Sequence, residues 1–154
     1  MIGLPFTTLI HEIGHALGLV SSTKYGEARI YIGDFSKSNK ESFKIGRIHF
    51  HITLGRGGLC RYEKNNDMTK LQSAITTIGG PLISALFTFV LYLLLHQPIN
   101  KYYLITGMFW LNFIQFVVTV IPIIYPKWWR PYGGYPSDGY KVLNILRGKG
   151  TNDS

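Results

Sequence analysis

Two long stretches without a charged side chain constrain the fold more than any other feature of this sequence. Residues 74–95 form one stretch of 22 residues, and residues 102–126 form another of 25. A bilayer core about 30 Å thick is crossed by roughly 20 helical residues at about 1.5 Å each. The sequence therefore predicts membrane-spanning helices at residues 74–95 and 102–125, and it argues against a disordered chain or an ordinary soluble domain.

The amino-terminal segment predicts a third membrane-spanning helix over residues 1–20. It is apolar apart from His11, Glu12 and His15, and Pro5 is tolerated in the first turn of a helix. A signal peptide would have a basic start and an A-x-A-like cleavage site, and the segment has neither. We therefore expect residues 1–20 to remain in the protein as a transmembrane helix.

The first connecting segment, residues 21–73, predicts a small β-rich loop. Residues 28–33 and 43–54 alternate apolar and polar side chains with the period of a strand. A glycine-rich run at residues 55–58 interrupts the pattern. We expect a small sheet or hairpin on the membrane surface.

Residues 126–147 predict an interfacial segment, because aromatic and basic side chains alternate there and a short amphipathic helix can follow at residues 137–147. The length of 154 residues suits a single membrane-embedded domain, residues 1–154. The expected fold is thus all-α and integral to the membrane. It has about three transmembrane helices, a small cytoplasmic β element and a carboxyl-terminal amphipathic helix.

The basic residues predict the orientation of this fold. The chain has 16 Lys and Arg against 8 Asp and Glu; ten of the 16 lie in residues 21–72, five follow residue 126, and Lys101 stands alone. Three spans put the two rich segments on one side, which the positive-inside rule makes cytoplasmic. We therefore expect a multi-pass protein of the cell membrane, with anionic lipid rather than nucleic acid as the partner of the basic residues.

The segment His11-Glu12-Ile13-Gly14-His15 is an HExxH motif. Four helical residues turn through about 400°, so His11 and His15 lie on nearly one face and can share a zinc ion. Glu12 can then serve as the base toward a water molecule at the metal. The alternative is a polar packing cluster, but a carboxylate at membrane depth is costly and favours a functional role.

A catalytic zinc ion takes three protein ligands, so the motif requires one more. Asp138 is the best candidate, because it follows Pro136 beyond the last predicted span and opens the amphipathic segment. The alternative is that Asp138 only caps that helix, which is a common role for an aspartate after a turn. Cys60 is the single cysteine, which excludes an intramolecular disulfide and a multi-cysteine zinc site.

The sequence resembles the site-2 protease family of intramembrane zinc metalloproteases. The resemblance rests on four segments, residues 11–18, residues 79–82 (Gly-Gly-Pro-Leu), Pro122 and residues 136–141 (Pro-Ser-Asp-Gly-Tyr-Lys). It implies a hydrolase that cleaves a peptide bond in or near the transmembrane segment of a membrane-protein substrate, with its active site open to the cytoplasm. It also implies that His11, His15 and Asp138 bind one Zn²⁺, that Glu12 is the catalytic base, and that a regulatory membrane partner exists.

The sequence departs from the family pattern at two places. Thr119 stands where family members usually have an asparagine, three residues before Pro122, and residues 127–135 form an insertion. The threonine bears on how a substrate strand is held. Asn112, Gln115 and Thr119 form a polar stripe at helical spacing, which predicts either substrate positioning or hydrogen bonds between helices.

Two other groups of residues leave further functions open. His49 and His51 share one strand face and could bind metal, although a solvated face is the simpler interpretation. A non-proteolytic zinc protein with a structural, chaperone or partner-binding role is the main alternative function. A lipid-surface module built on Trp128, Trp129 and Arg130 is another.

Overall fold

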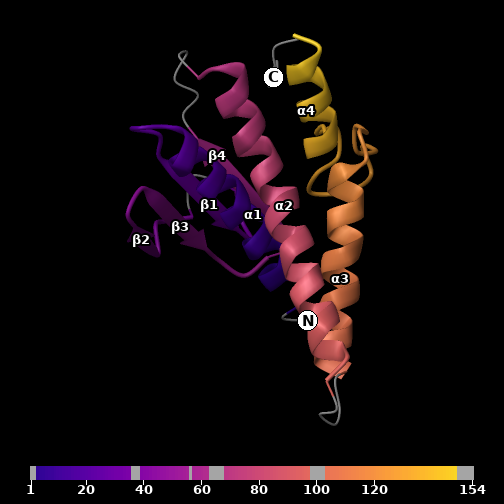
Figure 1. The fold of residues 1–154 in the computed structure, drawn as a ribbon. Coiled ribbons are helices and arrows are strands. Elements are labelled where there is room, and N and C mark those ends of the chain that lie inside the picture. Colours follow the sequence, from indigo (N-terminus) through magenta and orange to yellow (C-terminus); the bar gives the residue numbers. More distant parts are fainter. Residues whose placement is uncertain (1–2, 36–38, 56, 63–67, 98–102, 149–154) are drawn as a thin grey trace.

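The computed structural model describes residues 3–35, 39–55, 57–62, 68–97 and 103–148 (Figure 1). Over these ranges the chain forms four α-helices and one four-stranded mixed sheet. In chain order the elements are α1 (Gly3–Ser22), β1 (Ala28–Ile32), β2 (Phe43–Ile45), β3 (Ile48–Ile52), β4 (Gly58–Tyr62), α2 (Lys70–Leu95), α3 (Tyr103–Val120) and α4 (Asp138–Leu146). The expected all-α fold is therefore wrong, because the sheet is a major part of the structure.

The sheet has the strand order β2-β3-β1-β4. β1 pairs in parallel with β3 and antiparallel with β4, while β2 and β3 form an antiparallel hairpin. The single strand expected at residues 43–54 is divided into β2 and β3, because Gly46 adopts a positive φ of 57° that suits a turn. β4 was not predicted, since it begins at the last residue of the glycine-rich run, Gly58, and its five residues do not alternate in polarity.

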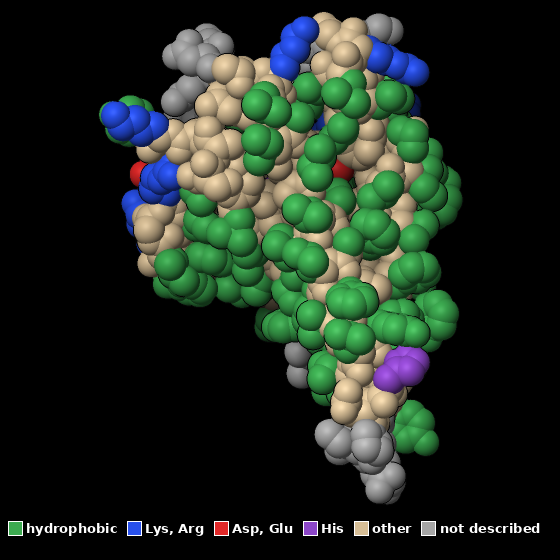
Figure 2. Space-filling model, viewed as in Figure 1, with side chains coloured by type: hydrophobic (Ala, Val, Ile, Leu, Met, Phe, Trp, Pro, Cys, Tyr) green, Lys and Arg blue, Asp and Glu red, His purple; other side chains and the backbone are tan. Residues whose placement is uncertain are grey.

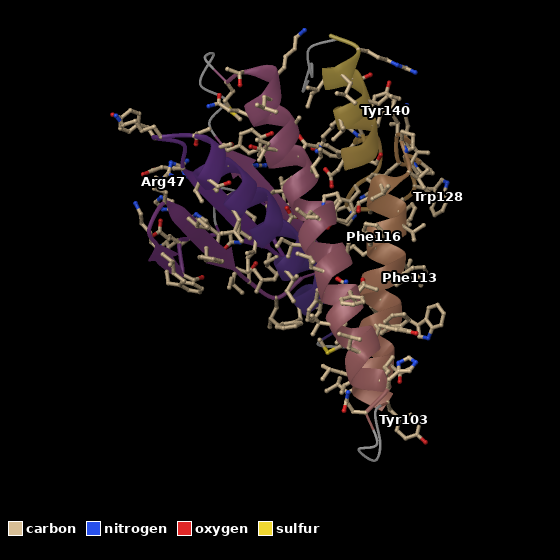
Figure 3. The ribbon with its side chains drawn as sticks, in the orientation of Figure 1. Arg47, Tyr103, Phe113, Phe116, Trp128 and Tyr140 are labelled. Atoms are coloured by element: carbon tan, nitrogen blue, oxygen red, sulfur yellow. The ribbon has the colours of Figure 1, made fainter. Side chains whose placement is uncertain are left out.

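The core of the fold lies between the sheet and α1. Its buried apolar side chains are Ala16, Leu19, Ala28, Ile30, Ile32, Ile48 and Phe50. Arg47 fastens the end of α1 to the sheet, since its guanidinium donates hydrogen bonds to the carbonyls of Val20, Thr23 and Gly26 (Figure 3). These carbonyls would otherwise lack partners at the carboxyl end of the helix.

A second face of α1 packs closely against α2. A Cβ on Gly14 would collide with the backbone of Gly79, and one on Gly18 would lie 2.7 Å from the carbonyl oxygen of Ile75. Small residues at such positions let two helix backbones approach each other. Gly79 therefore serves the close packing of α1 against α2.

Of the described residues, only α2 and α3 form helices long and apolar enough to cross a membrane. Most of their surface is exposed, and apolar side chains cover it in Figure 2. The core helix of a soluble protein would instead be mostly buried, although length and composition by themselves are weak evidence of a span. The expected third span at residues 1–20 is wrong, since α1 carries polar residues on faces that are covered by protein.

The bounds of the two apolar helices also differ from those expected. α2 begins at Lys70 rather than residue 74, because Thr69 and Gln72 form a capping box that starts the helix earlier. α3 ends at Val120 rather than residue 125, just ahead of Pro122, whose ring and missing N–H do not suit a continued helix. The expected amphipathic helix at residues 137–147 is confirmed as α4.

Candidate metal centre

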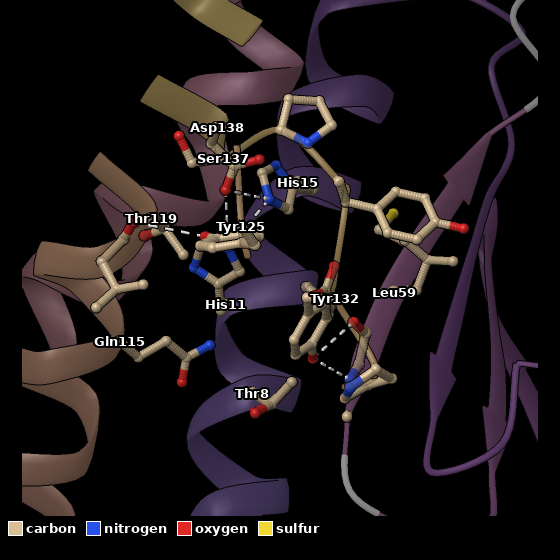
Figure 4. A pocket seen from close by; sticks show the side chains of 18 of the residues that line it. Thr8, His11, His15, Leu59, Gln115, Thr119, Tyr125, Tyr132, Ser137 and Asp138 are labelled. Atoms are coloured by element: carbon tan, nitrogen blue, oxygen red, sulfur yellow. Dashed lines mark hydrogen bonds and ion pairs between the residues drawn. The ribbon is translucent and has the colours of Figure 1, made fainter. Parts of the chain in front are cut away.

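Three side chains with metal-binding atoms meet where α1, α2 and α4 converge (Figure 4). The Nε2 atoms of His11 and His15 lie 3.1 and 3.2 Å from Oδ2 of Asp138, and 3.2 Å from each other. All three side chains are buried. Within the described part of the chain they form the one group of three or more such residues close enough to hold a metal ion.

The other ring nitrogen of each histidine is held by α2. Nδ1 of His15 donates to the backbone carbonyl of Thr76 at 2.9 Å, and Nδ1 of His11 lies 2.9 Å from Oγ of Ser84. A carbonyl can only accept, so Nδ1 of His15 carries a proton, which leaves Nε2 to hold either a second proton or a metal ion. Contacts of this kind set the tautomer and orientation of metal-binding histidines.

The inward-facing atoms need a proton or a metal ion between them. Nε2 of His15 faces a carboxylate oxygen, which can only accept. Two acceptors at 3.2 Å repel each other unless a proton or a metal ion lies between them. The donor set of two imidazoles and one carboxylate therefore fits a divalent metal ion, and this group could hold one.

Asp138 reaches the histidines because another residue caps α4. Oγ of Ser137 accepts the N–H of Tyr140 at 3.2 Å and donates to the carbonyl of Ile121 at 2.6 Å. Asp138 is therefore not the capping residue that the alternative interpretation required. Burial alone would raise the pKa of the Asp138 carboxyl, but the histidines and Lys141 hold it well below its ordinary value. The carboxylate is thus ionised and able to bind a cation.

Gly80 makes room for His15. A Cβ at this position of α2 would lie 2.6 Å from Cε1 and 2.7 Å from Cδ2 of the His15 ring. Real Cβ atoms essentially never come this close to another atom. A glycine at this position therefore lets the backbone of α2 lie directly against the His15 ring.

Glu12 lies beside the three ligands without a partner of its own. Its side chain is buried, yet among the described residues no hydrogen bond or ion pair engages its carboxylate. β4 covers it closely, since a Cβ on Gly58 would lie 3.1 Å from Cγ of Glu12. The carboxylate thus stands beside the ligand atoms with no hydrogen bond to another described residue, which leaves it able to act on a molecule bound there.

A cavity of about 520 Å³ opens in front of these residues. α1, β4, α3 and the connection from Tyr125 to Asp138 form its walls. Gln115 and Thr119 lie on its α3 side (Figure 4). Asn112 does not line it; its amide donates to the carbonyl of Ser84 and to Oγ1 of Thr88, both at 2.7 Å. The structure thus gives Asn112 the role of joining two helices.

Of the other candidate residues, His49 and His51 lie away from the centre, while Cys60 lines the cavity. His49 lies 2.7 Å from the carboxylate of Glu41 and 3.3 Å from that of Glu27, while Nδ1 of His51 lies 2.9 Å from the carbonyl of Asn39. They do not belong to the group that could hold a metal. Burial raises the pKa of the Cys60 thiol, which favours an unreactive cysteine.

Sequence reasoning did not find the residues that support the ligands. Thr76 contacts His15 through its backbone carbonyl, so the type of residue at this position gives no indication of the contact. Ser84 sits one turn after Gly80 on the helix face toward α1, which became visible only once the packing of the two helices was known. Tyr132 also went unnoticed, although its hydroxyl contacts β4 at the cavity wall.

Comparisons with family models, with curated proteins and with solved structures found no match to this chain.

Proposed function

We propose that this protein is a zinc-dependent endopeptidase that cleaves a peptide bond in or near the transmembrane segment of a membrane-protein substrate. The observation that carries the proposal is a Glu12 side chain that lines the cavity and makes no hydrogen bond or ion pair with a described residue, beside three converging ligand atoms from His11, His15 and Asp138. A purely structural metal site has no use for a free carboxylate at that position. The resemblance to the site-2 protease family supports the same reaction.

In this proposal His11, His15 and Asp138 hold one Zn²⁺, which when bound supplies a Lewis acid that polarises the scissile carbonyl. Zinc suits the donor set, because hydrolytic zinc sites commonly combine two histidines with one carboxylate and leave a position open. Thr76 and Ser84 keep the imidazoles oriented through their Nδ1 atoms.

Glu12 acts as the general base and then as the general acid. It takes a proton from the water that attacks the peptide carbonyl and returns it to the departing amine. Its position one residue after His11 keeps it next to the ligands and on the wall of the cavity, where a bound substrate would lie. Without an ion pair to compete for it, its carboxylate is free to exchange a proton during the reaction.

A peptide substrate is supported by β4. This strand is at the edge of the sheet and pairs, within the described residues, only with β1, while Gly58 and its neighbours line the cavity. A free strand edge offers backbone groups that an extended peptide can pair with. A transmembrane helix must unwind to expose a carbonyl, so we propose that the substrate is cleaved in an extended conformation.

Location in the cell membrane is also part of the proposal. α2 and α3 would cross the bilayer, and the basic residues before Lys70 and after Pro126 would place the centre toward the cytoplasm. Trp128, which points outward beside α3 in Figure 3, suits the headgroup layer. The lipid bilayer, a membrane-protein substrate and a regulatory membrane protein are then the expected partners.

The test compares the wild type with Glu12→Gln and with the matched control Glu27→Gln, which changes an exposed glutamate outside the cavity. Each protein is purified in detergent, its zinc content is measured, and labelled single-span substrates are added. We expect zinc in all three and cleavage by the wild type and the control only. Zinc in all three with no cleavage by any would favour a non-proteolytic metal protein, and cleavage by Glu12→Gln would exclude Glu12 as the base.

A further inference from the structure

The hydroxyl of Tyr132 occupies both backbone groups of one residue in β4. The N–H of Gly58 donates to Oη of Tyr132 at 2.7 Å, and the same hydroxyl donates to the Gly58 carbonyl at 3.1 Å (Figure 4). A hydroxyl can donate and accept at once, so a single side chain satisfies the donor and the acceptor together. Tyr132 belongs to the connection between α3 and α4 and not to the sheet.

These two backbone groups lie on the free edge of β4. The N–H of Gly33 donates to the carbonyl of Gly57 at 2.9 Å, so Gly57 directs its backbone groups toward the side of β1. Backbone groups in a strand alternate sides from one residue to the next. Gly58 and Cys60 therefore direct theirs outward, and Tyr132 takes the place that a strand added to this edge would use at Gly58.

The same stretch of β4 lies over the catalytic candidate. A Cβ on Gly58 would lie 3.1 Å from Cγ of Glu12, and Gly58 and Tyr132 both line the cavity that contains the three ligands. A peptide paired with the outward groups of Gly58 and Cys60 would therefore run next to Glu12. Tyr132 and such a peptide cannot use the Gly58 groups at the same time.

We propose that Tyr132 is a latch: it closes the substrate-binding edge of β4, and an extended substrate segment must displace its hydroxyl to bind. The inference rests on the proposed function and deepens it by naming how access of peptide to the site is controlled. A substrate must break the two hydrogen bonds between Tyr132 and Gly58 in order to bind. An extended segment replaces them by pairing with the β4 backbone, whereas a segment that stays helical cannot replace them and is excluded. Tyr132 thereby favours unwound segments over intact helices.

The surroundings of Tyr132 suit a side chain that moves. Its ring forms tilted aromatic pairs with Phe35 and Tyr125, with centroids 6.5 and 6.2 Å away, and these contacts do not involve the hydroxyl. The connection nevertheless rests directly on the start of β4, since a Cβ on Gly57 would lie 2.9 Å from Cγ of Pro131. Removing only the hydroxyl should therefore release the edge while the ring and the connection stay in contact with the sheet.

The test uses Tyr132→Phe, with Tyr25→Phe as the control that removes a hydroxyl from an exposed tyrosine outside the cavity. Hydrogen exchange is followed at the amide of Gly58 in the full-length protein in detergent. We expect faster exchange in Tyr132→Phe and no change in Tyr25→Phe. Unchanged exchange at Gly58 in Tyr132→Phe would overturn the latch.

Binding is measured in the Glu12→Gln background with a short fluorescent peptide of alternating valine and threonine, a composition that favours the extended conformation. Removal of the hydroxyl should tighten peptide binding about three- to tenfold. The fraction of protein with an open β4 edge rises, because the closed form loses the net free energy of one or two neutral hydrogen bonds. In the active protein the Michaelis constant should fall by a similar factor, with the turnover number nearly unchanged. A lower turnover number with an unchanged Michaelis constant would make Tyr132 a participant in the chemistry and contradict the latch.

The two proposals fail in different ways. Faster exchange at Gly58 and tighter peptide binding in Tyr132→Phe, without cleavage by the wild type, would support the latch and reject the peptidase. Cleavage by the wild type with equal peptide affinity in both proteins would support the peptidase and reject the latch.

Discussion

Substitution of Gly80 by alanine tests whether the packing of α2 against His15 maintains the metal centre. The added methyl group would lie 2.6 and 2.7 Å from two ring carbons of His15, where real contacts stay beyond 3.0 Å. The ring or the helix must therefore move by several tenths of an ångström. Metal ligands need to hold their positions within about 0.2 Å, so we expect the shift to disturb metal binding.

The size of the effect follows from the crowding. Overpacking of a buried site costs about 1–3 kcal/mol, and loss of the support of a ligand lowers metal affinity about 10–100-fold. The control is Gly107→Ala in α3, where a Cβ would meet no atom within 4 Å. There the same change should stabilise the helix by about 0.5–1 kcal/mol and leave the metal affinity unchanged.

Zinc affinity is measured by competition with a chromogenic chelator, and the free energy of unfolding by denaturation in detergent micelles. The reasoning predicts weaker zinc binding and lower stability in Gly80→Ala alone. Wild-type zinc affinity in Gly80→Ala would refute it, because it would mean that His15 has room that the structure does not show.

Three further predictions concern other parts of the account. Ser84→Ala removes the partner of His11 Nδ1, so zinc affinity should fall about tenfold, and an unchanged affinity would show that Ser84 does not orient the ring. The hydrogen bond with His49 holds the pKa of Glu41 below its ordinary 4.5, so their pairing stabilises the fold above that pH and is lost as pH falls through the lower value. Glu41→Gln should therefore lower the unfolding midpoint above pH 4.5, and this loss should shrink as pH falls through the lowered pKa of Glu41; a loss that does not change with pH would contradict the pairing. Glycine or proline placed beside the cut site of a substrate should speed cleavage, because they ease unwinding, and an unchanged rate would count against an extended substrate.

The sequence predicted the local part of the site well. The spacing of His11 and His15 is a property of any α-helix, so the two imidazoles were expected on one face, and the structure places them there. Asp138 lies 127 residues from His11 in the chain. Its position beyond the last apolar segment indicated a ligand, but the choice between ligand and helix cap depended on Ser137, whose hydroxyl proved to be the cap.

The sequence was less informative about the fold. Residues 1–20 have the length of a membrane span. In the structure, however, the sheet covers one face of α1, and one strand of that sheet, β4, was not predicted. The polar face of α1 is buried by these partners, which a hydropathy pattern does not reveal. Tyr132 is recognisable only from its contact with Gly58, because a lone aromatic residue in a connection has no periodic signal.

The metal centre itself is tested most directly by the zinc-edge X-ray absorption spectrum of the purified protein. We predict bound zinc with two imidazole nitrogens and one carboxylate oxygen at about 2.0–2.2 Å, and loss of the carboxylate contribution in Asp138→Ala. Zinc bound without histidine scattering, or a protein that takes up no zinc at all, would contradict the assignment of His11, His15 and Asp138.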